Sequence, residues 1–136
     1  MSWLEAVIRT LFPRPTIERP SPKIRIRADQ VHIWNDTLTV TGLTNCFIAA
    51  IAPTNSMEPD IDDGMYVVLD PRPHTDLQIG DIIWFEAPTF RAIHRIIEIH
   101  EDDGWYCRTQ GDNNDRSDPV KVRPWEIKGV WRATIA

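Results

Sequence analysis

The stretch Ala92-Ile93-His94-Arg95-Ile96-Ile97-Glu98-Ile99 decides the fold class of this chain. It is short and rich in isoleucine, and turn residues stand on both sides, with Pro88 before it and Asp102-Asp103-Gly104 after it. A run of this length and composition between turn signals is typical of a β-strand. Because successive side chains of a strand point to opposite faces, we expect His94 to share a face with Ala92 and Ile96.

Runs of the same kind recur on both sides of this strand, each separated from the next by turn residues. The expected strands are Met65 to Leu69, Asp81 to Phe85, Trp105 to Thr109 and Ile127 to Thr134. Turn signals between them include Asp62-Asp63-Gly64, Pro71 to Pro73 and Gly111 to Pro119. Many short strands with a turn about every dozen residues predict an all-β barrel or folded sandwich.

The sequence upstream of these strands also predicts β-structure. Lys23 to Arg27 alternates apolar and basic residues, as a half-buried strand does. Val31 to Val40 contains Asn35-Asp36 between two alternating runs, which predicts a β-hairpin with a short turn. Cys46 to Ile51 is a continuous apolar run, for which we expect a strand buried on both faces.

The first 23 residues differ in composition from the rest. On a helix over residues 1–12 the apolar residues fall on one face: Trp3, Leu4, Val7, Ile8, Leu11 and Phe12. This stripe could pack on the chain's own domain, dock on a partner protein or lie on a membrane surface. Four prolines between residues 13 and 23 predict a stiff, extended connector. We therefore expect an amphipathic helix (1–12), a connector (13–23) and one β domain (24–136).

Composition argues against several classes of function. The 136 residues suffice for one domain with a real core. The formal net charge is −5, so a broad nucleic-acid-binding surface is not expected. No stretch has the roughly 18 to 20 apolar residues of a membrane span, and Glu5 and Arg9 interrupt any signal-peptide core. Cys46 and Cys107 form neither a disulfide framework nor a zinc motif, and predict a reducing, cytoplasmic compartment.

A serine between two prolines is the first candidate for chemistry. Ser56 lies in Pro53-Thr54-Asn55-Ser56-Met57-Glu58-Pro59, where the prolines restrict the backbone. A serine hydroxyl needs an adjacent base to act as a nucleophile, and hydrogen-bond donors to stabilise the oxyanion. The segments at Asn55 and Met57 and the Thr54 hydroxyl are the candidate oxyanion and substrate-binding groups. Ser56 could instead cap a turn that begins at Met57.

His94 is the candidate base, since histidine is the natural general base at neutral pH. The other three histidines lie in less suitable places: His32 in the hairpin, His74 in a proline-rich turn and His100 at a strand end. The structural alternative is that His94 is a half-buried strand residue whose polar atoms are satisfied by one hydrogen bond.

The loop Gly111 to Pro119 carries Asp112, Asp115 and Asp118. It does not fit a calcium loop, because the sixth position counted from Asp112 is Ser117 where such loops have glycine. A carboxylate from this loop could orient the imidazole of His94, as the third member of a catalytic triad does. The alternative is a solvated acidic turn. A second acidic group, Asp60, Asp62 and Asp63, predicts a turn at the site's entrance. We expect no metal and no cofactor.

Three of these segments resemble motifs of the type I signal peptidase and LexA-type serine peptidase superfamily, over about residues 51 to 130. Ser56-Met57-Glu58-Pro59 is similar to the Ser-Met-x-Pro nucleophile box, and Gly80-Asp81-Ile82-Ile83 to the Gly-Asp-hydrophobic strand after it. Gly111-Asp112-Asn113-Asn114, with the later Ile127-x-Gly129, resembles the closing boxes. The resemblance implies an antiparallel β-barrel assembly in which an extended substrate adds a strand.

His94 directs the resemblance to one branch of that superfamily. Bacterial signal peptidases and LexA-type proteins use a lysine on this strand, whereas archaeal and endoplasmic-reticulum signal peptidases use a histidine with an aspartate. The resemblance implies Ser56 as nucleophile and His94 as base. It implies Asp118, or else Asp112, as the carboxylate that orients the imidazole.

Two departures from the superfamily narrow the expected function. Signal peptidases of this branch carry a transmembrane anchor, and here only the amphipathic stretch 1–12 precedes the domain. LexA-type repressors carry a helix-turn-helix and an Ala-Gly or Cys-Gly cleavage site, and neither dipeptide occurs. We expect a soluble or peripherally membrane-associated serine endopeptidase that cleaves an extended polypeptide after small side chains. The alternative is a catalytically silent module that binds peptides or proteins on the same fold.

Overall fold

A computed structural model describes residues 18–136, so the expected helix over residues 1–12 lies outside the described residues. The strands are β1 (Val31–Trp34), β2 (Thr37–Val40), β3 (Phe47–Ala50), β4 (Tyr66–Asp70), β5 (Ile82–Glu86), β6 (Arg91–His100), β7 (Tyr106–Gln110) and β8 (Ile127–Ile135). The helices are short 3-10 turns at Ala28–Gln30, His74–Asp76 and Pro124–Glu126. The prediction of a mainly β fold is confirmed.

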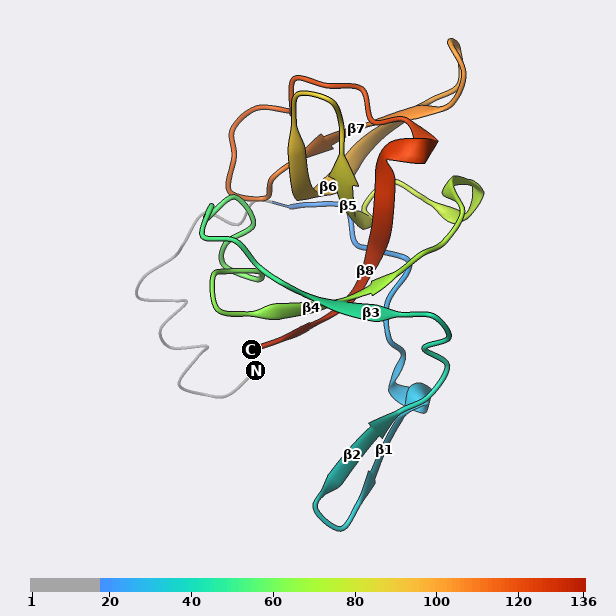
Figure 1. The fold of residues 1–136 in the computed structure, drawn as a ribbon, viewed down its shortest axis with the longest axis vertical. Coiled ribbons are helices and arrows are strands. Elements are labelled where there is room, and N and C mark those ends of the chain that lie inside the picture. Colours follow the sequence, from blue (N-terminus) through green and yellow to red (C-terminus); the bar gives the residue numbers. More distant parts are fainter. Residues whose placement is uncertain (1–17) are drawn as a thin grey trace.

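Six strands form one antiparallel sheet in the order β3-β4-β8-β5-β6-β7. Strand β8 connects two halves of this sheet, because its last residues pair with β4 and its first residues pair with β5. Figure 1 shows β3 and β4 beside one end of β8, and β5, β6 and β7 beside the other. Within residues 18–136, β3 and β7 are the two edges and do not pair with each other, so the expected barrel is not closed.

The strands β1 and β2 form a separate hairpin that stands away from the sheet (Figure 1). Its two-residue turn begins at Asn35, whose φ of 53° is a left-handed conformation that asparagine tolerates well. Ile33 pairs with Leu38 across the hairpin, and their side chains are 72% and 62% exposed. The predicted hairpin is therefore confirmed, with an apolar face that the described residues leave largely uncovered.

The other strand predictions have mixed outcomes. The five strands predicted between Met65 and Thr134 are confirmed, each within one residue at either end. Residues 23–27 are not a strand: Lys23 and Ile24 lie in a bend, and Ile26 donates its N–H to the carbonyl of Arg132. The prediction that residues 46–51 are buried on both faces is wrong, because β3 is an edge strand and Ile48 is 62% exposed.

Strand β5 lies between two hydrophobic cores. Because successive residues of a strand point to opposite faces, Ile83 enters the first core and Ile82 the second. The first core also contains Phe85, Ile96, Cys107, Val122 and Val130, and the second contains Met57, Ile61, Val67 and Leu69. Met57 directly follows the candidate nucleophile. The second core therefore anchors the loop that carries Ser56.

Candidate active site

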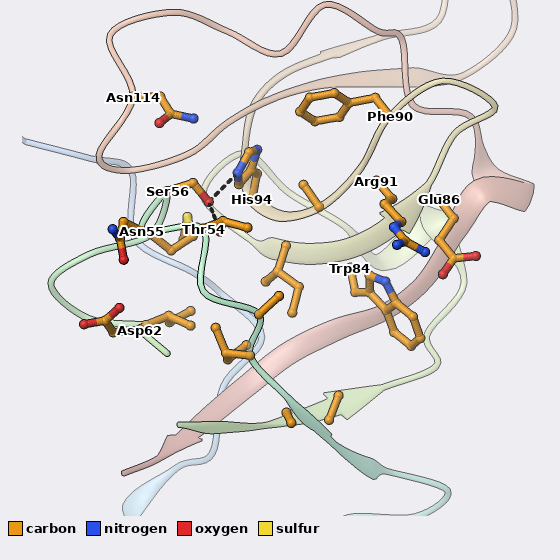
Figure 2. A pocket seen from close by; sticks show the side chains of 18 residues that line it. Thr54, Asn55, Ser56, Asp62, Trp84, Glu86, Phe90, Arg91, His94 and Asn114 are labelled. Carbon is orange, nitrogen blue, oxygen red and sulfur yellow. Dashed lines mark hydrogen bonds between the residues drawn. The ribbon is translucent and has the colours of Figure 1, made fainter. Parts of the chain in front are cut away.

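Ser56, His94 and Asp118 come from three separate parts of the chain and form one hydrogen-bonded row. Nε2 of His94 lies 2.9 Å from Oγ of Ser56, the contact drawn in Figure 2, and Nδ1 lies 2.6 Å from Oδ2 of Asp118. An ionised carboxylate only accepts hydrogen bonds, so the contact to Asp118 puts the proton of a neutral imidazole on Nδ1. The lone pair of Nε2 then faces the serine hydroxyl.

The imidazole and the carboxylate are both removed from solvent. His94 lies in β6 with 3% of its surface exposed, and Asp118 is 4% exposed. Phe90 packs beside the imidazole, with ring centroids 6.1 Å apart. A second donor, Oγ1 of Thr109, lies 2.5 Å from the same Oδ2 of Asp118. The two buried donors, from His94 and Thr109, thus fix the orientation of the Asp118 carboxylate.

The loop around Ser56 is held by backbone contacts. Asn55 has a φ of 58°, and its carbonyl accepts a hydrogen bond from the side-chain amide of Asn113. The carbonyl of Ser56 accepts the N–H of Asn113 at 2.9 Å. Within residues 18–136 the hydrogen-bond partners of the Ser56 hydroxyl are His94 and Thr54, at 2.9 and 3.2 Å. The hydroxyl therefore does not cap the turn after it.

Gly111 lies where the acidic loop passes closest to the row. A Cβ atom at this position would lie 2.6 Å from the Ser56 carbonyl oxygen and 3.0 Å from Nε2 of His94. The first distance, to a backbone atom, is shorter than carbon atoms adopt, and the second would require the imidazole to move by a few tenths of an ångström. Only glycine lets the loop approach the candidate nucleophile and base this closely.

The two candidate aspartates lie on opposite sides of β6. Adjacent residues of a strand point to opposite faces, so His94 and Arg95 project in opposite directions. Asp118 contacts His94, whereas both carboxylate oxygens of Asp112 accept hydrogen bonds from Arg95, at 2.8 and 2.7 Å. Arg95 and Asp112 form a largely buried ion pair, with side chains 8% and 9% exposed. Asp118 therefore lies beside the imidazole of His94, whereas Asp112 holds the acidic loop through its ion pair with Arg95.

The remaining candidate residues occupy several positions around the site. Met57 is 4% exposed, and its sulfur accepts the N–H of Asp112 at 3.3 Å. Its side chain therefore contacts the acidic loop that carries Asp112. The carboxylate of Asp62, on the turn at the entrance, raises the pKa of the Glu58 carboxyl by charge repulsion. Within residues 18–136 there is no group of three or more His, Cys, Asp or Glu side chains that could hold a metal ion.

Beside Ser56 lies an open groove of about 690 Å³. One wall is β3 and the residues after it, with small side chains such as Ala50 and Ala52. The other wall is the β5–β6 hairpin, with Trp84 (Figure 2) and with Ile93. Ser56 and His94 are among the residues that line this groove.

Three residues of the site were missed by sequence reasoning. Arg95 and Gly111 lay inside quoted motifs, but no role followed from the sequence, because both act through contacts with distant segments. Thr109 was taken only as the end of a strand, and no sequence signal singles out its hydroxyl.

Comparison of the chain with protein-family models, with curated proteins and with solved structures finds no match in any of the three. Among the helices of residues 18–136, none has the length and hydrophobicity needed to cross a membrane. The geometry of the site is therefore the feature from which a function can be inferred.

Proposed function

We propose that this chain is a serine endopeptidase with a Ser56–His94–Asp118 triad, similar to the histidine branch of the signal peptidase and LexA-type superfamily. The observation that carries the proposal is the row of two short contacts, 2.9 Å from Ser56 to His94 and 2.6 Å from His94 to Asp118. The same spatial arrangement of nucleophile, base and orienting carboxylate occurs in serine peptidases with unrelated folds. The open, coiled sheet is proposed to be this chain's form of the superfamily's barrel assembly.

The proposed reaction uses each member of the row in turn. Nε2 of His94 takes the hydroxyl proton as Oγ of Ser56 attacks the scissile carbonyl. Asp118 stabilises the imidazolium that forms. His94 then gives the proton to the leaving amine, which departs and leaves an acyl-enzyme. Water attacks the acyl-enzyme with help from the same imidazole, and Ser56 is regenerated.

Donors for the developing oxyanion stand close to Ser56. Within residues 18–136, the backbone N–H groups of Ser56 and Met57 donate no hydrogen bond to the backbone. The hydroxyl of Thr54, 3.2 Å from Oγ of Ser56, is a third group close to the reacting atom. Donors placed before the reaction begins stabilise the transition state most effectively.

The groove has two free backbone edges that suit an extended peptide. The N–H of Ile51 donates toward β4, to the carbonyl of Met65, so the N–H of Ala50 points to the outer edge of β3. On β6 the N–H of Ile96 donates toward β5, so the backbone groups of Arg95 and Ile93 point to the opposite edge. Strand β7 pairs with that edge only from Arg95 onward. The backbone of Ile93 therefore faces the groove. A substrate strand between β3 and β6 would find hydrogen-bonding partners on both sides.

The alternative function is a binding module that grips an extended peptide in this groove without cleaving it. The groove and its free edges support both functions equally. A buried imidazole held between a carboxylate and a serine favours the peptidase, because peptide binding alone does not require that row.

A peptide library tests the proposal. We expect the full chain to cleave a subset of peptides, and Ser56→Ala or His94→Gln to reduce kcat by roughly 10⁴-fold or more. Ser21→Ala, an exposed serine outside the site, is the matched control and should cleave like the wild type. Cleavage that survives in Ser56→Ala would rule out the assigned nucleophile.

A further inference from the structure

Thr109 is a buried hydroxyl residue that the proposed reaction does not use. It lies in β7, is 0% exposed and pairs with Ile96 of β6. Because Ile96 is two residues beyond His94, Thr109 and His94 face the same side of the sheet. A buried hydroxyl needs a hydrogen-bond partner, and here the partner is the carboxylate of Asp118.

Thr109 holds Asp118 through two separate contacts. Its hydroxyl donates to Oδ2 of Asp118 at 2.5 Å, and its carbonyl accepts the N–H of Asp118 at 2.8 Å. Nδ1 of His94 donates to the same Oδ2, at 2.6 Å. Asp118 is the last residue before Pro119 in a loop whose preceding residues 115–117 are exposed. The backbone contact fixes where this loop ends, and the hydroxyl contact fixes the rotation of the carboxylate.

We propose that Thr109 is the positioning residue of the triad, whose hydroxyl fixes the carboxylate of Asp118 so that it accepts the Nδ1–H of His94. The proposal rests on the peptidase function proposed above. Without the hydroxyl, the carboxylate keeps one side-chain donor among residues 18–136, Nδ1 of His94, and can rotate away from the imidazole. His94 then loses its fixed orientation toward Ser56, although none of the three triad residues has been changed.

The test compares Thr109→Val and Thr109→Ala, which remove the hydroxyl, with Thr109→Ser, which keeps it. With a peptide that the wild type cleaves, we expect the first two to lower kcat by about tenfold with KM nearly unchanged. Thr109→Ser should retain most of the wild-type kcat. Thr134→Val removes a threonine hydroxyl from β8, away from the site, and is the matched control for strand stability.

A second readout does not depend on peptidase activity. The ¹⁵N chemical shifts of the His94 imidazole, assigned by their absence in His94→Gln, report which ring nitrogen carries the proton and how strongly it is hydrogen-bonded. We expect these shifts to change in Thr109→Val and Thr109→Ala and to stay near wild type in Thr109→Ser. Unchanged shifts in both hydroxyl-free variants would overturn the positioning role, even if their melting temperatures fall.

The two readouts separate the failure of this proposal from the failure of the proposed function. If the wild type cleaves no peptide, the peptidase proposal fails, and the imidazole shifts still decide whether Thr109 orients the His94–Asp118 pair. If the wild type cleaves and Thr109→Val has the wild-type kcat, the peptidase proposal stands and the role of Thr109 is refuted. A kcat lowered equally in Thr109→Ser and Thr109→Val would also refute it, because the hydroxyl would then not be the cause.

Discussion

At the scale of single residues, two aspartates of one loop have different neighbours. Asp118 contacts the imidazole of His94, and Asp112 contacts the guanidinium of Arg95 on the opposite face of β6. Substitution by asparagine should therefore have different consequences at the two positions. Asp118→Asn should lower kcat by about 10⁴-fold, since an amide favours the wrong tautomer of His94. Asp112→Asn should instead destabilise the fold by roughly 3 kcal/mol, since it leaves the charge of Arg95 buried without its counterion.

Urea unfolding and peptide kinetics on both variants check this prediction. Rates are compared per folded molecule, so that loss of stability is not read as loss of catalysis. A large fall in kcat for a well-folded Asp112→Asn, with a mild effect of Asp118→Asn, would reverse the two assignments.

Cys107 gives a second prediction at this scale. Burial raises the pKa of its thiol to about 12, so the folded protein holds no reactive thiolate there near neutral pH. At about pH 8, iodoacetamide should alkylate the half-buried Cys46 and spare Cys107 until urea is added. Mass spectrometry measures the number of adducts per chain in each case. The unfolded thiol loses its proton near its ordinary value of 9.0, so stability should fall as pH rises above that value. Two adducts on the folded chain would contradict the prediction.

Residue types could be assigned to roles from the sequence, but contacts between them could not. Ser56 and His94 were chosen for their chemistry and their setting, a serine whose backbone is restricted by prolines and a histidine in an isoleucine-rich strand. The choice between Asp112 and Asp118 stayed open, because both lie in one loop and the sequence does not say how that loop crosses β6. The structure separates them only through the alternation of His94 and Arg95.

At the scale of elements, the loop after β7 lies directly against the loop that carries Ser56. Gly111→Ala tests this contact, because the added carbon would lie 2.6 Å from the Ser56 carbonyl, a backbone atom that cannot rotate away. We expect the loop to shift and the hydrogen bond from Asn113 to Ser56 to break. A displacement of this kind at a catalytic centre lowers kcat/KM by about 10²-fold.

Gly104→Ala is the control for this substitution. Gly104 lies in the turn between β6 and β7, and its nearest non-neighbouring atom would be 3.7 Å from the added carbon. Its φ of 69° makes alanine strained there, so this variant should lose about 1 kcal/mol of stability with little change in kcat/KM. Equal kinetics for Gly111→Ala and the wild type would show that the close approach is unimportant.

Elements were predicted best where local pattern decides them. The strand β6 and the hairpin over residues 31–40 follow from alternation and turn residues that lie within a few positions of each other. The burial of β3 was mispredicted, because an apolar run such as residues 46–51 looks the same in a central strand and at an edge. Its place in the sheet depends on its pairing with β4 alone, which the segment itself does not encode.

At the scale of the whole molecule, the sheet curls so that distant strands face each other. Three strands, β4, β8 and β5, separate β3 from β6 in the sheet order, yet residues of β3 and β6 line the same groove. The many short strands predicted a barrel or a folded sandwich, and strand number does not say whether the last edge of the sheet meets the first. The side of the sheet that faces Ser56 is open, and this opening is where we expect the substrate strand to lie.

A proline at the edge of β3 tests whether a substrate strand binds there. The N–H of Ala50 points away from β4 and into the groove, so Ala50→Pro removes no hydrogen bond of the sheet and should fold normally. It removes one donor that a substrate strand would use, so kcat/KM should fall about three- to tenfold through KM. Ile48→Pro is the matched control, because its N–H points to the same edge but Ile48 does not line the groove. If both prolines leave KM unchanged while Ser56→Ala abolishes cleavage, the substrate does not pair with β3, and the peptide is held by the β5–β6 wall instead.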